Sequence, residues 1–561
     1  MMTPLSSALA RTVRGFPSSR LSRLWRKGRT TLGALILAAA AAQGCLLAAP
    51  GAPYDIVIKG GTVVDGTGRA PHRVDVAIAD DRIVYVGALV GGTARETIDA
   101  TGLVVAPGFI DVHNHADTAL VEPSRKLNEG FVRQGVTTVV GGPDGSASPR
   151  RIRDMVAAYD RQGVGTNVAF YVGHNAIRQE VMAVPRAAPT SAELERMKAL
   201  VRDGMTLGAL GFSTGLMYEP GLFSSTDEVV ELTREVRAFG GIYDSHVRDP
   251  AHALLGSDRE AIDIGERAGV PVKIAHEKAV GLENVGLIKD VVSLVESARR
   301  RGLNVVTDQY PYDGAATGPL TDLIVVPPAL AAAPAFDLRA ALRLPQTRLE
   351  LQVASEQGLN GGFAWLKATG YSHMRITTSP DAPELVGRYL SQLAAERRMT
   401  GFDLVADLIL QPGAPIGVTF GAIDEDDVQL LLVQPWNMIA SDGEDVAPTG
   451  TGGHPRSTGT FPRVLGHYVR EKRLLSLEEA VRKMTSFPAD FVGLTGRGRL
   501  VAGKAADITV FDPTRIIDRS SYASPRRYAD GVRHVLVNGR FVLRDGAMTG
   551  AAPGRFLPRE R

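Results

Sequence analysis

Short apolar runs that end in polar residues alternate with longer helical patterns through the middle of this chain. Segments between the runs, such as 189–205 and 224–240, begin with Pro, Ser or Thr, carry apolar residues three and four positions apart and end near Gly, as helices do. Repeated strand and helix units predict a parallel β-sheet or barrel. The eight runs read, in order, LVVAPGFIDVHNH, GVTTVVGGPD, NVAFYVGHN, GALGFSTG, GIYDSHVRD, VPVKIAHEK, LNVVTDQYPY and WNMIASDG.

A (β/α)8 barrel accounts for both the number of the runs and their polar ends, because the active site of such a barrel lies at the carboxyl ends of its strands. The alternative is a doubly wound open sheet, which gives no reason for polar residues at nearly every strand end. We therefore expect a barrel over residues 106–490. A Pro- and Ala-rich stretch at about 320–375 interrupts the alternation. This stretch predicts an inserted subdomain or lid. The alternative is a surface segment without a function.

Hairpin patterns flank this region on both sides. YDIVIKGGTVVDGTG and DVAIADDRIVYVG precede it, and GRLVAGKAADITVFDP and VRHVLVNGRFVLRDG follow it. Val and Ile alternate there beside tight-turn residues such as Gly-Gly and Asp-Gly, as in β-hairpins. We expect residues 54–105 and 491–550 to form one small β-domain, separated in sequence and joined in space. The alternative is that the two flanks form separate, unrelated β-structures.

The first 45 residues have the pattern of an export signal. Seven basic residues and no acidic residue occur in this segment, and an apolar run over 32–42 lies in it. That run is shorter than the about 20 residues that span a bilayer, so we expect a cleaved signal and a periplasmic or cell-envelope location. Cys45 follows the run and resembles a bacterial lipoprotein processing site. Lipid attachment at Cys45, with membrane anchoring, and simple cleavage near Ala49 or Ala52 both remain open.

The charge balance argues against one class of function. After residue 45, acidic residues outnumber basic ones by 61 to 56, and no basic cluster marks a nucleic-acid surface. The chain has one cysteine, which excludes an intramolecular disulfide, so its stability must come from a packed core.

Histidines and a carboxylate at strand ends predict a metal centre. His113 and His115 lie two positions apart, so both imidazoles point to the same face of an extended strand. His246, His276 and Asp442 end three later runs. Four imidazoles and one carboxylate at a barrel mouth are suited to one or two divalent metals, and the imidazole content favours zinc. Such a site activates water and polarises an amide carbonyl, while Asp442 carries the proton to the departing amine.

These residues stand in longer motifs that resemble the amidohydrolase superfamily and, within it, the N-acyl-D-amino-acid deacylase (D-aminoacylase) family. FSTGLMYEPG and HPRSTGTFPRVLG are the most specific of the motifs to the deacylase branch. The resemblance implies a TIM-like metallo-dependent hydrolase barrel that hydrolyses the amide bond of N-acyl-D-amino acids. The motifs run from about Tyr54 to Gly546 and read PGFIDVHNHAD, QGVTTVVGG, GFSTGLMYEPG with SSTDE, SHVRD, IAHEK, YPY, SDG, HPRSTGTFPRVLGHYVRE and GRLVAGKAADITVFDP.

The resemblance also implies a division of the metal ligands. His113 and His115 would hold the more exposed metal together with Asp442. His246 and His276 would hold the other metal. A small-molecule N-acyl amino acid would be the binding partner of this site.

One ligand position departs from the pattern of the family. Where the family commonly has a cysteine after the second strand, this chain has Asp144, in GGPDGS. A carboxylate can bridge two metals but is a harder ligand than a thiolate, which leaves the preference among zinc, cobalt and manganese open. The alternative for Asp144 is an ordinary turn residue in Pro-Asp-Gly.

Three further positions correspond to substrate-binding residues of the family. The resemblance assigns Lys278, Tyr310 and Arg456 to the substrate carboxylate, whose bidentate pairing with arginine would fix the stereochemistry. The alternatives are ordinary ion pairs and a tyrosine at the edge of the core. A hydroxyl-bearing residue expected after YPY is missing from DGAATG, where Thr317 is the nearest substitute. His174, in FYVGHN, is a further pocket candidate without an assigned role.

Three alternative functions remain. A dipeptidase for D-residues and a hydantoinase-like cyclic-amide hydrolase would use a similar site. Cyclic-amide relatives often bridge their metals with a carboxylated lysine, and no lysine follows the second strand here. The third alternative is a non-catalytic, envelope-anchored binding protein, which the intact ligand positions and Asp442 argue against.

Overall fold

The computed structural model describes residues 54–89, 93–332, 336–359, 362–447 and 452–560. The expected export signal and Cys45 lie outside these residues, so export and lipid attachment stay predictions. Within the described ranges, no helix is both long enough and apolar enough to cross a bilayer.

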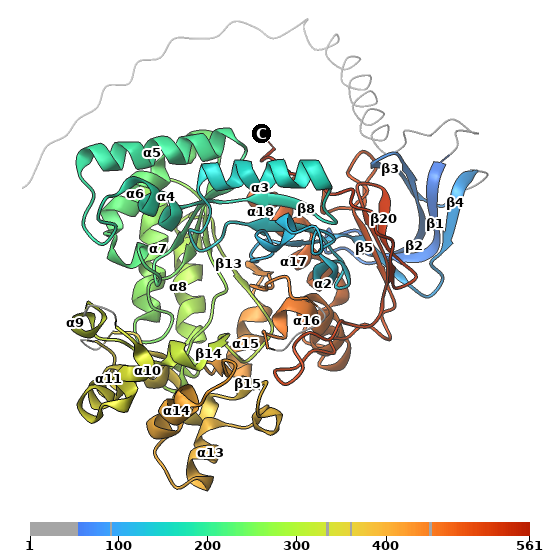
Figure 1. Cartoon of the computed structure of the whole chain (residues 1–561). Helices are drawn as coiled ribbons and strands as arrows, with labels where there is room; N and C mark the ends of the chain where they lie inside the picture. The colour runs from blue at the N-terminus through green and yellow to red at the C-terminus, as the bar shows by residue number, and fades with distance from the viewer. Residues whose placement is uncertain (1–53, 90–92, 333–335, 360–361, 448–451, 561) are drawn as a thin grey trace, which may run out of the picture. The chain divides into compact units, whose positions relative to one another are not determined.

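Parallel strands from the eight predicted runs form the barrel (Figure 1). β6, β7 and β8 pair in one sheet, and β9 to β13 with β17 pair in a second. Only Tyr171 separates β8 from β9, so these two segments form one barrel strand that joins the two sheets. The (β/α)8 prediction is therefore confirmed. The strands are β6 (Phe109–Asp111), β7 (Val136–Gly141), β8 (Asn167–Phe170), β9 (Val172–Gly173), β10 (Gly211–Gly215), β11 (Ile242–His246), β12 (Val272–Ile274), β13 (Val305–Gln309) and β17 (Asn437–Ile439).

The last strand region closes the barrel against the first. The Asp442 amide N–H donates to the carbonyl oxygen of His113 at 2.8 Å, and the His115 amide N–H donates to that of Gly443 at 2.8 Å. Of the two predicted metal ligands after β6, His113 is thus tied by a backbone hydrogen bond to Asp442, and His115 is tied to the residue that follows Asp442. Closure of the barrel and assembly of the site depend on the same contacts.

Helices cover the outer face of the barrel strands. α5 (Ser191–Thr206) begins with a capping box, in which Thr190 and Glu193 each accept a hydrogen bond from the other's backbone amide. Its buried residues include Met197 and Val201, which join the main core. The other helices after barrel strands include α3 (Pro149–Gln162), α6 (Thr226–Arg234), α7 (Leu254–Ala268), α8 (Ile288–Arg300), α15 (Glu425–Leu432) and α17 (Leu477–Met484).

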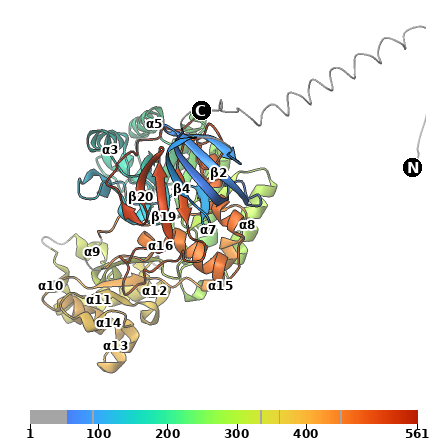
Figure 2. The same cartoon turned by 90° about the vertical axis from the view of Figure 1, so that its right-hand side faces the viewer.

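The two flanks of the barrel form one nine-stranded sheet. β18 pairs with β5 in antiparallel orientation, with Ile508 opposite Pro107 and Phe511 opposite Val104. Figure 2 shows strands from both ends of the chain in this sheet. The expectation of one β-domain, joined in space, is confirmed. Its strands are β1 (Tyr54–Val63), β2 (His72–Ala79), β3 (Arg82–Gly87), β4 (Ala94–Asp99), β5 (Val104–Pro107), β18 (Ile508–Phe511), β19 (Val532–Val537), β20 (Arg540–Arg544) and β21 (Ala547–Met548).

A separate hydrophobic core lies between β13 and β17, where we expect an insertion at about 320–375. The core runs from Leu320 to Phe420, which extends well past residue 375. The reason is that the strand Ala316–Pro319, at the start of the insertion, pairs with the strand Gly417–Phe420 at its end. The residues after 375 therefore belong to the same unit. Its elements are β14 (Ala316–Pro319), α9 (Pro328–Ala331), α10 (Leu338–Arg343), α11 (Pro345–Gln357), α12 (Trp365–Thr369), β15 (Ile376–Thr378), α13 (Leu390–Glu396), α14 (Gly401–Leu410) and β16 (Gly417–Phe420).

A buried charge network crosses three neighbouring strands of the barrel. Lys273 on β12 has no exposed surface, and its ammonium nitrogen lies 2.7 Å from Asp244 Oδ1 on β11. The same ammonium forms an ion pair with Asp308 on β13. Side chains alternate along a strand, so Asp244 points to the same face of β11 as the predicted ligand His246. The network therefore lies inside the barrel, below the site.

Replacement of Lys273 by methionine is expected to destabilise the fold by about 3–5 kcal/mol, because two buried carboxylates lose their counter-ion. Urea unfolding monitored by circular dichroism would measure the loss. The matched control is Lys289→Met, since Lys289 is exposed on α8, and its effect should stay within about 0.5 kcal/mol. Equal stability of the two variants would contradict this account of the network.

Candidate metal centre

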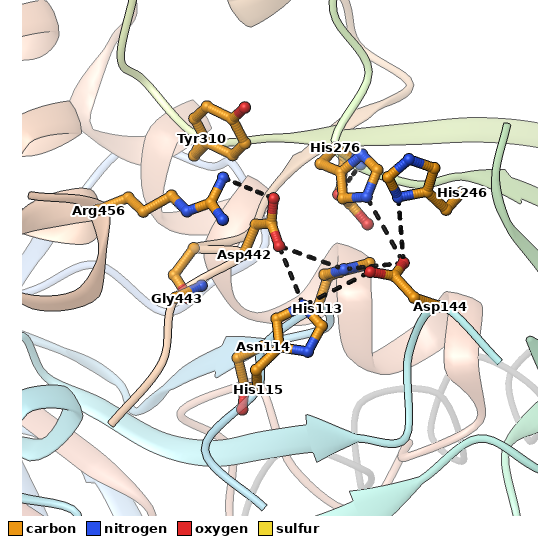
Figure 3. Close-up of polar contacts among 12 residues, drawn as sticks. His113, Asn114, His115, Asp144, His246, His276, Tyr310, Asp442, Gly443 and Arg456 are labelled. Carbon is orange, nitrogen blue, oxygen red and sulfur yellow. Dashed lines mark hydrogen bonds and ion pairs between the residues drawn. The ribbon is translucent and has the colours of Figure 1, made fainter. Parts of the chain in front are cut away.

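The residues predicted as metal ligands lie together at the mouth of the barrel (Figure 3). Every one of them stands at or just after the carboxyl end of a barrel strand, which is where barrel enzymes place their chemistry. They are His113 and His115 after β6, Asp144 after β7, His246 at the end of β11, His276 after β12 and Asp442 after β17.

Asp144 occupies the centre of the cluster. Its Oδ1 atom lies 3.5 Å from His113 Nε2, 3.5 Å from His246 Nδ1 and 3.6 Å from His276 Nε2. Its Oδ2 atom lies 3.6 Å from His115 Nε2. Burial alone would raise the pKa of Asp144, but the imidazoles around it hold that pKa well below its usual range. The carboxylate is therefore ionised and available as a shared ligand.

Asp442 borders the cluster on one side. Its Oδ1 atom lies 3.2 Å from His115 Nε2 and 3.6 Å from His113 Nε2. Its Oδ2 atom lies 2.7 Å from Arg456 Nη1. One oxygen therefore faces the imidazoles while the other is held by a guanidinium group.

These distances fit a divalent metal. Zinc bonds of 2.0–2.2 Å in a tetrahedral site place neighbouring donor atoms about 3.3–3.6 Å apart, which is close to the separations between carboxylate oxygens and imidazole nitrogens in the cluster. Several buried donors also make no hydrogen bond with any described residue, namely both ring nitrogens of His113, Oδ1 of Asp144 and Nδ1 of His246. Such atoms are costly to bury without a partner. A cation shared through Asp144 would satisfy Nε2 of His113, Oδ1 of Asp144 and Nδ1 of His246, which face one another.

The backbone at three of these residues is strained. Asp144, His276 and Asp442 have φ values of 56°, 37° and 49°, in a left-handed region that residues with a side chain seldom adopt. Hydrogen bonds hold two of them in place. The His276 amide donates to Asp308 Oδ1 at 2.6 Å, and the Asp442 amide donates to the carbonyl of His113. Strain of this kind concentrates at functional sites, where the surrounding structure maintains it.

Lys278 orients one of the imidazoles. Its ammonium group lies 2.8 Å from His276 Nδ1 and donates to the carbonyl oxygen of the same residue at 2.7 Å. The other ring nitrogen, Nε2, is then directed to Asp144. Burial lowers the pKa of Lys278 to about 8, although Asp442 opposes that shift. Lys278 thus contacts the candidate metal centre and also lines the adjoining cavity.

Arg456 and Tyr310 form a stacked pair beside Asp442. The guanidinium of Arg456 lies 4.6 Å from the centre of the Tyr310 ring. The Tyr310 hydroxyl donates to the carbonyl oxygen of Ala315 at 2.7 Å, and Tyr310 is not among the residues of the cavity wall. Tyr310 therefore supports Arg456 through its ring face, and its hydroxyl has a backbone partner.

His174 lies away from the cavity, contrary to its choice as a pocket candidate. Its ring is buried, and Nε2 lies 3.0 Å from Oε1 of Glu228, which also forms an ion pair with Arg178. His174 follows the end of β9 directly, as the metal ligands follow their strands, but a carboxylate from α6 is its partner. The position at a strand end alone did not distinguish it from the metal ligands.

A cavity of about 550 Å³ opens over the cluster. Its wall includes Thr317, which the sequence proposes as the substitute hydroxyl residue, together with Lys278 and Arg456. Other wall residues were not assigned from the sequence. Met217 and Tyr218 belong to the GFSTGLMYEPG motif, and Glu444 and Asp445 lie two and three residues after Asp442, so a local signal could have found them. Trp365 comes from the insertion, and no local signal marks it. The unassigned wall residues include Glu122, Arg125, Met217, Tyr218, Trp365, Glu444 and Asp445.

Replacement of Asp144 by cysteine is expected to shift the metal preference toward zinc, because a thiolate is a softer ligand than a carboxylate. The test is competition between zinc and manganese at equal concentration, followed by measurement of the bound metals by mass spectrometry. The zinc-to-manganese ratio should rise in Asp144→Cys and stay unchanged in the exposed control Asp154→Cys, which lies on α3. An unchanged ratio in both variants would argue that Asp144 is not a ligand.

Comparison with known proteins identifies the family. The model of the amidohydrolase family matches residues 96–243 and 371–543. The chain is 35% identical to a D-aminoacylase and 34% identical to an N-acyl-D-glutamate deacylase, both from Alcaligenes xylosoxydans xylosoxydans. These alignments cover 90% of this chain and 98% and 97% of the two relatives.

A solved relative agrees with this result. The N-acyl-D-glutamate deacylase of Bordetella bronchiseptica, in complex with zinc and a phosphonate inhibitor, is 32% identical and superposes with a TM-score of 0.74 over 90% of this chain and 100% of that chain. The resemblance seen in the sequence motifs is confirmed. The chain belongs to the amidohydrolase family and is related to its N-acyl-D-amino-acid deacylases.

Proposed function

We propose that this protein is a zinc-dependent deacylase that hydrolyses the amide bond of N-acyl-D-amino acids and releases a carboxylate and a D-amino acid. One observation carries the proposal: a candidate metal centre, the carboxylate of Asp442 and the cations Lys278 and Arg456 border the same cavity. This set matches a substrate whose carboxylate lies one carbon away from the amide to be cleaved. The relatives that act on N-acyl-D-amino acids support the same substrate class.

The metal would be held by the four histidines with Asp144 and Asp442, and when bound it polarises the amide carbonyl and lowers the pKa of water. Asp442 is the group that moves the proton. Burial alone would raise its pKa, but Arg456 and the neighbouring imidazoles hold that pKa well below its usual range. Asp442 is therefore ionised and able to accept a proton, which it then delivers to the amide nitrogen so that the amine can leave.

Lys278 and Arg456 would bind the carboxylate of the substrate. Arg456 is largely buried and fixed between Asp442 and the ring of Tyr310, so its position is set before the substrate arrives. A substrate bound at both its carboxylate and its amide can place its side chain in only one direction. That direction differs between the D- and the L-enantiomer. We attribute selectivity for the D-enantiomer to this arrangement, with the relatives as further support.

The other functions are less consistent with the site. Among the described residues of the cluster the central ligand is Asp144, not a lysine of the kind that cyclic-amide hydrolases carboxylate. A non-catalytic protein would not need Asp442 aligned by Arg456 beside the imidazoles. Export to the periplasm or cell envelope is a separate proposal, and it rests only on the pattern of residues 1–45.

The direct test is release of amine from N-acetyl-D- and N-acetyl-L-amino acids by the zinc-loaded protein. We expect release from the D-series. Asp442→Asn should lower kcat by about 10²–10⁴-fold, since it removes the acid–base group, while the exposed control Asp154→Asn should keep the wild-type rate. Zinc content should be measured for all three proteins. If zinc is bound and no amine is released from either series, the deacylase proposal is wrong.

A further inference from the structure

The charges of the cavity wall outside the metal centre are not balanced. Arg125 forms an ion pair with Asp445, with 2.8 Å between Nε and Oδ2. Glu122 and Glu444 also line the cavity, and neither side chain forms a hydrogen bond or ion pair with a described residue. Among the described residues, these two carboxylates of the wall therefore form no ion pair, while both arginines of the wall are already paired, Arg125 with Asp445 and Arg456 with Asp442.

The two carboxylates belong to connected loops. Glu122 lies in the loop that follows β6, three residues before Arg125, and Glu444 follows β17, next to Asp445. The ion pair between Arg125 and Asp445 ties these loops together. Glu122 and Glu444 therefore face the cavity from adjoining segments, and both are exposed, so they are accessible to a ligand in it.

This charge pattern opposes a second carboxylate on the substrate. The cations of the wall are Arg125, Lys278 and Arg456. Asp445 already pairs with the first, and the other two lie beside Asp442 and His276, where the proposed function needs them for the α-carboxylate. An acidic side chain would meet two unpaired glutamates instead of a free cation. The pattern differs from what an enzyme for N-acyl-D-glutamate would require.

We propose that the preferred substrate carries an ammonium or guanidinium group that Glu122 and Glu444 bind. This inference rests on the proposed function and names the substrate class of the same site. The positive group has two chemical sources. It is either the side chain of a D-amino acid such as lysine or arginine, or the free amine of an aminoacyl group, in which case the substrate is a dipeptide that ends in a D-residue.

Matched substrates separate the two sources. N-acetyl-D-lysine and N-acetyl-D-norleucine differ by the side-chain amine, whereas glycyl-D-alanine and N-propionyl-D-alanine differ by the amine of the acyl group. The full-length, zinc-loaded protein should favour the positively charged member of at least one pair by roughly two- to fivefold in kcat/KM, the scale of exposed ion pairs. The pair that responds identifies the source.

Variants and salt show whether charge causes the preference. In the double variant Glu122→Gln, Glu444→Gln the ratio within the responding pair should fall toward one, and in the wild type it should fall as salt increases. Glu195→Gln, on the exposed face of α5, is the matched control and should keep the wild-type ratio. The protein should hydrolyse N-acetyl-D-glutamate more slowly than N-acetyl-D-glutamine.

Hydrolysis without any preference within the pairs, or with D-glutamate preferred over D-glutamine, would overturn this inference and leave the deacylase proposal standing. No hydrolysis of any substrate by zinc-loaded protein would overturn both.

Discussion

One carboxylate, that of Asp144, faces four imidazoles at the mouth of the barrel, and the site depends on this contact. The four nitrogen atoms lie 3.5–3.6 Å from its oxygens, which is too far for good hydrogen bonds and close to the spacing of donors around one metal ion. Because the histidines come from three different strands, no local segment can form the cluster. It requires the closed barrel, and a bound cation would in turn hold those strands together.

The interior of the barrel supports this centre through charge and backbone geometry. Lys273 neutralises Asp244 and Asp308, and Asp308 also accepts the hydrogen bond from the backbone amide of His276. One buried network therefore stabilises three strands and fixes a strained ligand. On the other side, the hydrogen bond from the Asp442 amide to the carbonyl of His113 closes the barrel and holds the proposed proton carrier beside the candidate metal centre. The contacts that stabilise the barrel are therefore also the contacts that position the residues of the candidate metal centre.

Most of the barrel and of its metal cluster could be predicted from the sequence, because each strand carries its own apolar run and its own polar end. His113 and His115 are a local signal of this kind. The limits of the insertion could not be predicted, since β14 finds its partner β16 about a hundred residues later. The role of His174 also depended on a distant residue, Glu228. Trp365 enters the cavity only because a separate core positions α12, and no pattern near it indicates that position.

We infer that Asp144 is the shared ligand of a zinc centre, and anomalous diffraction from crystals of the zinc-loaded protein would show this without relying on activity. Data collected on both sides of the zinc absorption edge should show a peak in contact with the carboxylate of Asp144 and the imidazoles of His113 and His115, with a second peak toward His246 and His276 if two ions bind. Zinc bound elsewhere, with no peak in contact with Asp144, would show that Asp144 is not the shared ligand.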